Sequence, residues 1–198
     1  MSEDGRIAIL VGSQGRGSNM RALAEACARG DVPASVALVV SPKEATGAVE
    51  TARKLGLAVA VLPYKDPAYE ERLVSLLHEA GVQWICLAGT MRLLPSQVLA
   101  AYPDRVLNIH PALLPKFGGK GMYGHHVHEA VLAAGETESG CTVHRVNERY
   151  DEGEIVLQLR CPVLPDDTPE TLAARVLALE HQAYAQALAL EIQRRNGG

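Results

Sequence analysis

The stretch IAILVGSQGRGSNMRALAEACARG, residues 7–30, combines three patterns that together indicate the fold. Residues 7–12 are a continuous apolar run, the glycine-rich segment 12–19 follows, and residues 20–30 have the composition of a helix that ends at a glycine. An apolar strand, a tight turn and a helix in this order are typical of a βα unit in a parallel sheet.

The same alternation continues through the first two-thirds of the chain. Further strands are predicted at 35–41, 57–63, 84–89 and 106–110, and helices at 44–55, at 67–80 and after Pro95. The last third changes character, with a predicted helix at 126–134, an antiparallel hairpin from strands 140–146 and 154–163, and a long amphipathic helix from Thr168. We therefore expect one α/β domain that binds ligands at the carboxyl ends of its strands.

The composition is that of an ordinary globular protein. Hydrophobic residues make up 47% and charged residues 21% of the 198, and the net charge of −4 argues against nucleic-acid and membrane-surface binding. The acidic start MSEDGR lacks the character of a secretory signal, and no apolar run approaches the ~20 residues of a membrane span. The four cysteines, Cys27, Cys86, Cys141 and Cys161, show no C-x-x-C spacing, so we expect reduced thiols in a cytoplasmic protein.

The segment GSQGRGSN at 12–19 lies between the first strand and the first helix, where α/β sheets bind ligands. Gly15 and Gly17 allow a ligand to approach the backbone, and the helix N-terminus offers unpaired N–H groups to an anion. The alternative is a glycine turn in which Ser18 or Asn19 caps the helix. Because Ser18 stands in place of the Walker A lysine and G-x-G-x-x-G is absent, a single phosphate is the predicted ligand.

The stretch LNIHPALLP at 107–115 carries the main candidates for catalysis. Asn108 and His110 are two apart on a predicted strand, so their side chains point to the same side, and Pro111 ends the strand at the rim. An amide N–H and an imidazolium N–H that converge on one point would stabilise a developing oxyanion. The alternative for His110 is a structural role at the strand end.

Asp151, in YDEGEI, has two interpretations that the residues alone leave open. Asp-Glu-Gly is ordinary turn chemistry, but a hairpin that returned Asp151 beside His110 would let the carboxylate orient the imidazole and relay a proton. The run HHVH at 125–128 is weak evidence for a metal, since a fourth ligand is lacking, and we expect hydrogen-bonding roles. His144 is interpreted as a core or site-lining side chain, and Glu180 by default as part of a solvated helix face.

Taken together, the motifs show that the chain resembles the glycinamide ribonucleotide formyltransferases, folate-dependent enzymes of purine synthesis. The matching segments, in family order, are GRGSN (15–19), AGTMRLL (88–94), NIHPALLP (108–115), SGCTVH (139–144), DEGEI (151–155) and ARVLALEH (174–181). The resemblance implies an α/β, Rossmann-like formyltransferase fold: a mostly parallel central sheet flanked by helices, with a C-terminal antiparallel hairpin and a long final helix. It also implies a single domain over residues 1–198, with a phosphate-binding half to about residue 105 and a catalytic, folate-binding half from about residue 106.

The resemblance also implies roles for individual residues. The catalytic set would be Asn108, His110 and Asp151. The ribonucleotide phosphate and ribose would be bound by Gly17, Ser18, Asn19 and Glu180, and the folate by Met91, Arg92, Leu93 and Leu94 with Asn108. Four further residues match positions that line the site: Thr142, His144, His126 and His128. Segment 116–125 is longer than the K-Y-x-G segment of the family, which leaves the contacts of this loop open.

The implied reaction moves a formyl group from the co-substrate 10-formyltetrahydrofolate to the amine of glycinamide ribonucleotide. It requires no metal, and we expect small-molecule partners only, without nucleic acid or membrane, in a monomer or homodimer. The alternatives are formyltetrahydrofolate deformylase, another folate-dependent formyltransferase such as the methionyl-tRNA enzyme, and a nucleotide-phosphate sensor that uses loop 15–19 alone. The net charge of −4 does not suit a tRNA substrate.

Overall fold

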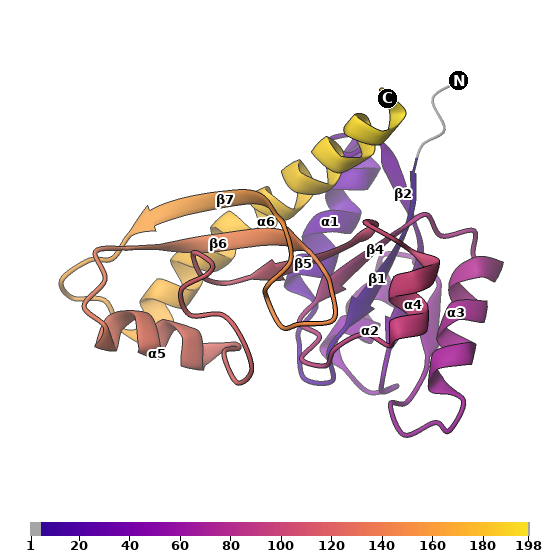
Figure 1. Ribbon diagram of the computed structural model, residues 1–198, viewed down its shortest axis with the longest axis horizontal. Coiled ribbons are helices and arrows are strands. Elements are labelled where there is room, and N and C mark those ends of the chain that lie inside the picture. Colours follow the sequence, from indigo (N-terminus) through magenta and orange to yellow (C-terminus); the bar gives the residue numbers. More distant parts are fainter. Residues whose placement is uncertain (1–4, 198) are drawn as a thin grey trace.

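The computed structural model describes residues 5–197 and contains one seven-stranded sheet with helices on both faces (Figure 1). The strands are β1 (Gly5–Val11), β2 (Ala34–Ser41), β3 (Val59–Val61), β4 (Trp84–Ala88), β5 (Val106–His110), β6 (Glu138–Arg145) and β7 (Ile155–Pro162). Their order in the sheet is β3-β2-β1-β4-β5-β6-β7. Strands β1 to β5 pair in parallel, whereas β6 and β7 are antiparallel additions, as predicted.

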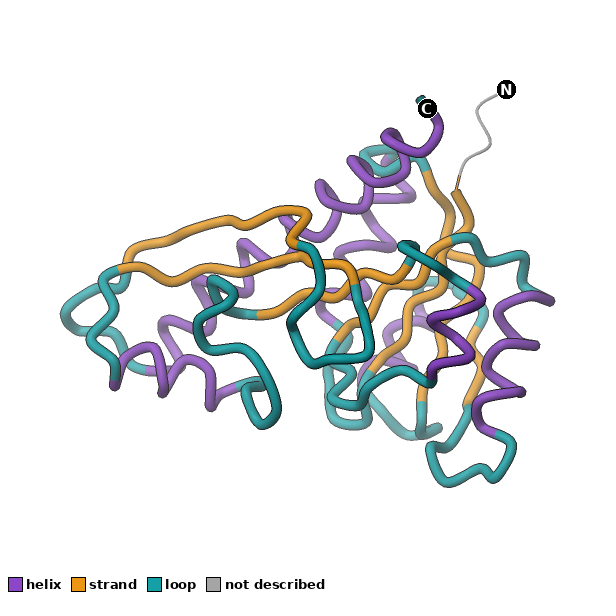
Figure 2. Tube along the Cα trace, in the orientation of Figure 1, coloured by secondary structure: helices purple, strands orange, loops and turns teal. Residues whose placement is uncertain are grey.

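Within residues 5–197, six helices alternate with the strands along most of the chain (Figure 2). They are α1 (Ser18–Arg29), α2 (Gly47–Lys54), α3 (Tyr69–Glu79), α4 (Ser96–Ala101), α5 (His125–Ala133) and α6 (Pro169–Asn196). Gly30 ends α1 in the left-handed region, and Thr168 and Thr171 cap α6 reciprocally, as their residue types indicate. The alternative in which Ser18 or Asn19 caps α1 is not what the structure shows, because the N-cap is Gly17 and no side chain bonds there.

The core lies on both faces of the sheet because the central strands are buried on both sides. Apolar side chains of α1, α2, α5 and α6 pack against one set of strand residues, and those of α3 and α4 pack against the alternate set. The Tyr184 hydroxyl, on α6, lies 2.8 Å from the Leu87 carbonyl oxygen of β4 and 3.0 Å from the Leu107 carbonyl oxygen of β5. Helix α6 is thereby tied to the centre of the sheet.

The sheet order creates a crevice at the carboxyl ends of β1 and β4. The chain leaves β1 towards β2 and leaves β4 towards β5, so the connections that follow these neighbouring strands diverge. Such a switch point is where α/β sheets bind ligands. In Figure 1 the connection between β6 and β7 lies beside β5. This connection brings residues from the last third of the chain to the crevice.

Two further observations concern the whole described chain. All four cysteines are free thiols in the described part of the chain, and three of them are buried. Within residues 5–197, no helix combines the length and the apolar character that crossing a membrane would need.

Candidate active site

A cavity of about 940 Å³ occupies the crevice. Its walls come from the loops after β1, β4 and β5, from β5 and β6, from the β6–β7 connection, and from α1, α5 and α6. The side chains of Asn108, His110, Asp151 and Glu180 all line it, although they are far apart in sequence. The structure therefore brings most of the predicted functional residues into one space.

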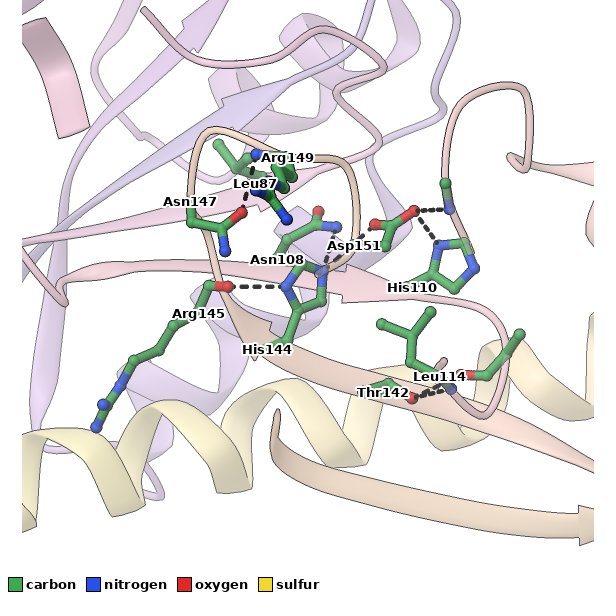
Figure 3. A network of polar contacts seen from close by, with 12 residues as sticks. Leu87, Asn108, His110, Leu114, Thr142, His144, Arg145, Asn147, Arg149 and Asp151 are labelled. Carbon is green, nitrogen blue, oxygen red and sulfur yellow. Dashed lines mark hydrogen bonds and ion pairs between the residues drawn. The ribbon is translucent and has the colours of Figure 1, made fainter. Parts of the chain in front are cut away.

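His110 and Asp151 form the centre of this site (Figure 3). His110 ends β5 and is 4% exposed, and its Nδ1 lies 3.5 Å from Asp151 Oδ2. The other ring nitrogen, Nε2, lies 2.7 Å from the carbonyl oxygen of Phe117, so it carries the proton and donates. The β6–β7 connection thus returns Asp151 beside His110, the arrangement that the sequence left open.

Asp151 is held by contacts on both carboxylate oxygens. Its backbone adopts φ 55, in the left-handed region that Asp and Asn tolerate better than most residues. The Gly119 N–H donates to Oδ2 at 3.0 Å, and His144 Nε2 lies 3.4 Å from Oδ1. Burial alone would raise the pKa of Asp151, but the contact with His144 and the charge of His110, which act when these rings are protonated, together with the Gly119 N–H outweigh it and lower that pKa. Asp151 is therefore a carboxylate at neutral pH.

Burial has the opposite consequence for the charge of His110. It lowers the pKa of the imidazole, and the carboxylate of Asp151 and the hydrogen bond to Phe117 offset this only in part. Neutral His110 is the favoured form at neutral pH. The Nδ1 that faces Asp151 is then the nitrogen able to take up a proton.

Asn108 lies beside a second histidine. Asn108 on β5 pairs with His144 on β6, and the Asn108 Nδ2 lies 3.1 Å from His144 Nε2. Thr142, two residues earlier on β6, is fully buried and lies behind the cavity wall. Its hydroxyl donates to the Ala112 carbonyl and accepts from the Leu114 N–H, so Thr142 supports the segment after His110.

Glu180 corrects one expectation from the sequence. The default prediction placed it on a solvated face of the last helix, yet it is 8% exposed and lines the cavity. Asn19 Nδ2 donates to Glu180 Oε2 at 2.7 Å. Burial raises the pKa of Glu180 to about 7, with the Asn19 hydrogen bond acting in the opposite direction. The default interpretation was wrong because the helix pattern does not show that α6 passes the crevice, whereas the family resemblance had implied a site role for Glu180.

The loop after β1 contributes Arg16 and the first turn of α1 contributes Asn19 to the cavity wall, whereas Gly17 and Ser18 are not among the lining residues. Gly17 has φ 77, and a Cβ there would lie 2.8 Å from Ala48 Cα on α2. Glycine is therefore required at this position by backbone conformation and by the packing of α1 against α2, whether or not a ligand binds.

The predicted folate-binding residues, Met91 to Leu94, form another wall of the same cavity. Met91 and Leu93 are 43% and 41% exposed, which is unusual for large apolar side chains and favours contact with an apolar ligand. The Arg92 guanidinium lies over the Tyr64 ring, 4.8 Å from its centroid. A smaller hollow of about 450 Å³ adjoins this wall and shares Arg92, Leu93 and Leu94 with it.

The HHVH run divides between the surface and the cavity. His126 is exposed, lies 3.3 Å from Glu129 and does not line the cavity. His128 is buried in the cavity wall; burial first, and then the charges of His125 and His110, lower its pKa to about 4. In the described range 5–197, no three His, Cys, Asp or Glu side chains are grouped to hold a metal ion.

Sequence reasoning did not foresee the backbone segment 117–119, which contacts both His110 and Asp151. The Phe117 carbonyl accepts from His110, and the Gly119 N–H donates to Asp151. Gly118 between them has no room for a side chain, since a Cβ would lie 2.5 Å from Leu114 Cδ2 and 3.3 Å from Asp151 Cβ. The adjacent glycines after Pro115 were the one signal of such a close approach.

Comparisons with known proteins show the family to which the chain is similar. The family model described as formyl transferase matches residues 5–188. The chain is 45% identical over 186 residues to a chloroplastic phosphoribosylglycinamide formyltransferase of Arabidopsis thaliana, covering 91% of this chain and 63% of that protein. It is 44% identical over 192 residues to the trifunctional purine biosynthetic protein adenosine-3 of Drosophila pseudoobscura pseudoobscura, covering 93% of this chain and 14% of that protein. The chain thus spans less than two-thirds of these two relatives.

Solved structures show the same fold over nearly the whole chain. The crystal structure of phosphoribosylglycinamide formyltransferase from Brucella melitensis superposes with a TM-score of 0.86 at 42% identity, covering 99% of this chain and 97% of that one. A formyltetrahydrofolate deformylase from Pseudomonas syringae has a TM-score of 0.85 at 21% identity, over 98% of this chain and 63% of that one. The latter likeness concerns the fold alone.

Proposed function

The chain belongs to the formyl transferase family, and we propose from this that it transfers a formyl group from 10-formyltetrahydrofolate to the amine of glycinamide ribonucleotide. The observation that carries the proposal is the convergence of Asn108, His110 and Asp151 in one cavity with Asn19 and Glu180. The names of the Arabidopsis, Drosophila and Brucella relatives support this substrate pair and a place in purine biosynthesis.

The cavity walls suggest how the two substrates would share the site. The ribonucleotide phosphate would bind at the backbone N–H groups of residues 17–19, where α1 begins, and the ribose hydroxyls would bind Glu180. The folate would occupy the wall of Met91 to Leu94, whose exposed apolar side chains suit a flat ring. In this proposal the chain acts as one domain, with a phosphate-binding half to about residue 105 and a catalytic, folate-binding half from 106.

The proposed chemistry is a direct attack of the substrate amine on the formyl carbon. A C–N bond forms, the carbonyl oxygen becomes an oxyanion, and the Asn108 amide N–H stabilises that charge. His110 carries a proton taken from solvent on Nδ1, where the carboxylate of Asp151 favours the cation; it keeps this proton throughout the reaction, and its positive charge stabilises the same oxyanion. The C–N10 bond then breaks, and the proton lost by the amine, relayed through Asp151, ends on the folate nitrogen.

The proposal assigns no role to a metal and names 10-formyltetrahydrofolate as a co-substrate. It includes no nucleic-acid or membrane partner, and it allows a monomer or a homodimer. The cytoplasm is our proposed location on the basis of the free cysteines, while the Arabidopsis relative is named chloroplastic.

Release of tetrahydrofolate, followed with and without glycinamide ribonucleotide, tests the proposal. We expect release only when the ribonucleotide is present, with one formylated product formed for each folate released. Release at the same rate without the ribonucleotide would identify a deformylase. Binding of the ribonucleotide without any turnover would indicate a sensor that uses loop 15–19.

A further inference from the structure

His144 is a second imidazole at the site for which the proposed chemistry has no use. It lies on β6, is 2% exposed, and faces Asn108 across the antiparallel β5–β6 pair. Its Nε2 has two polar neighbours, the Asn108 Nδ2 at 3.1 Å and the Asp151 Oδ1 at 3.4 Å. Both neighbours belong to the proposed catalytic set, so the protonation of this one nitrogen matters.

A backbone carbonyl decides which nitrogen of His144 carries the proton. The Arg145 carbonyl oxygen lies 2.9 Å from His144 Nδ1, and since a carbonyl only accepts, Nδ1 must carry a hydrogen. In the neutral ring Nε2 is then an acceptor. Of its two neighbours only the Asn108 amide can donate, because the carboxylate of Asp151 has no hydrogen to give.

We propose, as an extension of the proposed function, that His144 is a positioning residue that holds the Asn108 amide in its catalytic orientation. One N–H of the Asn108 amide is fixed on His144 Nε2, and the amide plane can no longer rotate freely about its last side-chain bond. The second N–H of the same group is left for the formyl oxygen in the cavity that Asn108 lines. A preorganised donor stabilises an oxyanion better than a rotating one, because no reorientation is needed during the reaction.

Two substitutions separate the two contacts of His144. In His144→Gln the side-chain oxygen reaches the place of Nε2 and can still accept from Asn108. In His144→Asn the shorter amide replaces Nδ1 and can still donate to the Arg145 carbonyl, but it leaves Asn108 without an acceptor. We expect His144→Asn to lower kcat by about 10- to 100-fold, less than the ~10²–10³ of a lost oxyanion donor, with both KM values within about twofold. His144→Gln should recover most of that loss.

A double-mutant cycle identifies the residue through which His144 acts. If His144 acts through Asn108, then His144→Asn should lower kcat almost no further in a protein that already carries Asn108→Ala. In a protein that carries Asp151→Asn, the same His144→Asn substitution should lower kcat by its full factor. If the effect of His144→Asn disappeared only in the Asp151→Asn protein, the proposal would be overturned in favour of a proton-transfer role. If His144→Asn lowered kcat by its full factor in both proteins, His144 would have a structural role. Higher activity in His144→Asn than in His144→Gln would contradict it as well.

A measurement without turnover separates this proposal from the proposed function. The side-chain amide N–H signals of Asn108 can be followed by 15N NMR in the ligand-free protein, with wild type and His144→Asn compared at the same pH. We expect both signals to move on substitution, and His144 in wild type to show the Nδ1–H form. Unmoved amide signals would overturn the positioning proposal even in an active enzyme. Moved signals in a protein that lacks ribonucleotide-dependent turnover would support the contact and refute the function.

Discussion

At the scale of single residues, the two carboxylates of the cavity are placed in opposite environments. Asp151 accepts a backbone N–H and lies between two imidazoles, which lowers its pKa despite burial. Glu180 has one amide partner and is otherwise buried, so its pKa rises to about 7. Two groups of the same chemistry are thereby suited to different tasks: Asp151 stays a carboxylate that favours a protonated His110, and Glu180 can present a protonated carboxyl group to neutral hydroxyls.

Asp151→Asn tests whether the charge of this residue matters. Asn tolerates the left-handed backbone at φ 55 as Asp does, so the turn should form normally. The variant loses the base and the charge that favours protonated His110. We expect kcat to fall at least about a hundredfold, the lower edge of acid–base contributions, with unchanged thermal stability. Unchanged kcat in a stable variant would show that Asp151 only shapes the turn.

Glu180→Gln tests the burial of this carboxyl through the pH dependence of stability. The pKa of Glu180 is about 7 in the native state, against an ordinary value of 4.5. Between pH 4.5 and pH 7 the native state therefore keeps a proton that the unfolded state releases. The contribution of Glu180 to stability is therefore greatest below pH 4.5 and declines as pH rises to about 7, by on the order of 3 kcal/mol.

Urea denaturation of both proteins at pH 5 and pH 8 measures this decline. The wild type should lose more stability between the two pH values than Glu180→Gln, which cannot ionise there. Equal losses in the two proteins would mean that Glu180 is not held neutral by burial. Turnover of the ribonucleotide by the same variant, with a raised KM expected, reports on the ribose contact separately.

At the scale of elements, the strand β5 was predictable in detail and the loops around it were not. Side chains alternate between the two faces of a strand, so Asn108 and His110, two residues apart in 106–110, lie on one side; this follows from strand geometry alone. The approach of Asp151 depends on the β6–β7 connection, and the contacts of 117–119 depend on a glycine loop, so both are set by tertiary packing. The helix pattern alone did not place Glu180 at the site for the same reason, since only the packing of α6 against the crevice buries it, whereas the family resemblance had implied a site role.

The segment 117–119 should position Asp151, and Gly118→Ala tests this. A Cβ at Gly118 would force Leu114 or Asp151 to move. We expect kcat to fall by about tenfold or more, because a misplacement of about 1 Å can cost 10²-fold in rate. Gly121→Ala is a control on the same loop: its Cβ would meet nothing within 4 Å, and the change adds only the backbone strain of a positive φ of 89, which Gly118 does not have. A similar fall in kcat in both variants would show that disturbing the loop is enough and that the close approach at Gly118 is not the cause.

The attachment of α6 to β4 and β5 rests on the Tyr184 hydroxyl, which contacts two buried carbonyl oxygens. Tyr184→Phe keeps the ring and removes the donor. We expect a loss of about 1–3 kcal/mol in the free energy of unfolding, the usual cost of an unsatisfied buried polar group. Urea denaturation measures the loss. A change below about 0.5 kcal/mol, the usual range for surface substitutions, would show that the contact contributes little to stability.

At the scale of the whole molecule, the alternation of apolar strands and helices was enough to predict a parallel sheet with a C-terminal hairpin. The order β3-β2-β1-β4-β5-β6-β7 was not predictable, because alternation along the chain does not say on which side of β1 each new strand pairs. That order makes the crevice between β1 and β4. The site could thus be predicted as a set of motifs, while its assembly into one cavity required the fold.

The central claim is that this cavity performs formyl transfer through His110, and turnover by His110→Ala tests it most directly. Single-turnover transfer from 10-formyltetrahydrofolate to glycinamide ribonucleotide would be measured beside the Kd of a folate analogue. We expect transfer to fall by about 10²–10³, the usual effect of losing one oxyanion donor, while analogue binding stays within about an order of magnitude. Near-normal transfer in a folded His110→Ala protein would contradict the account.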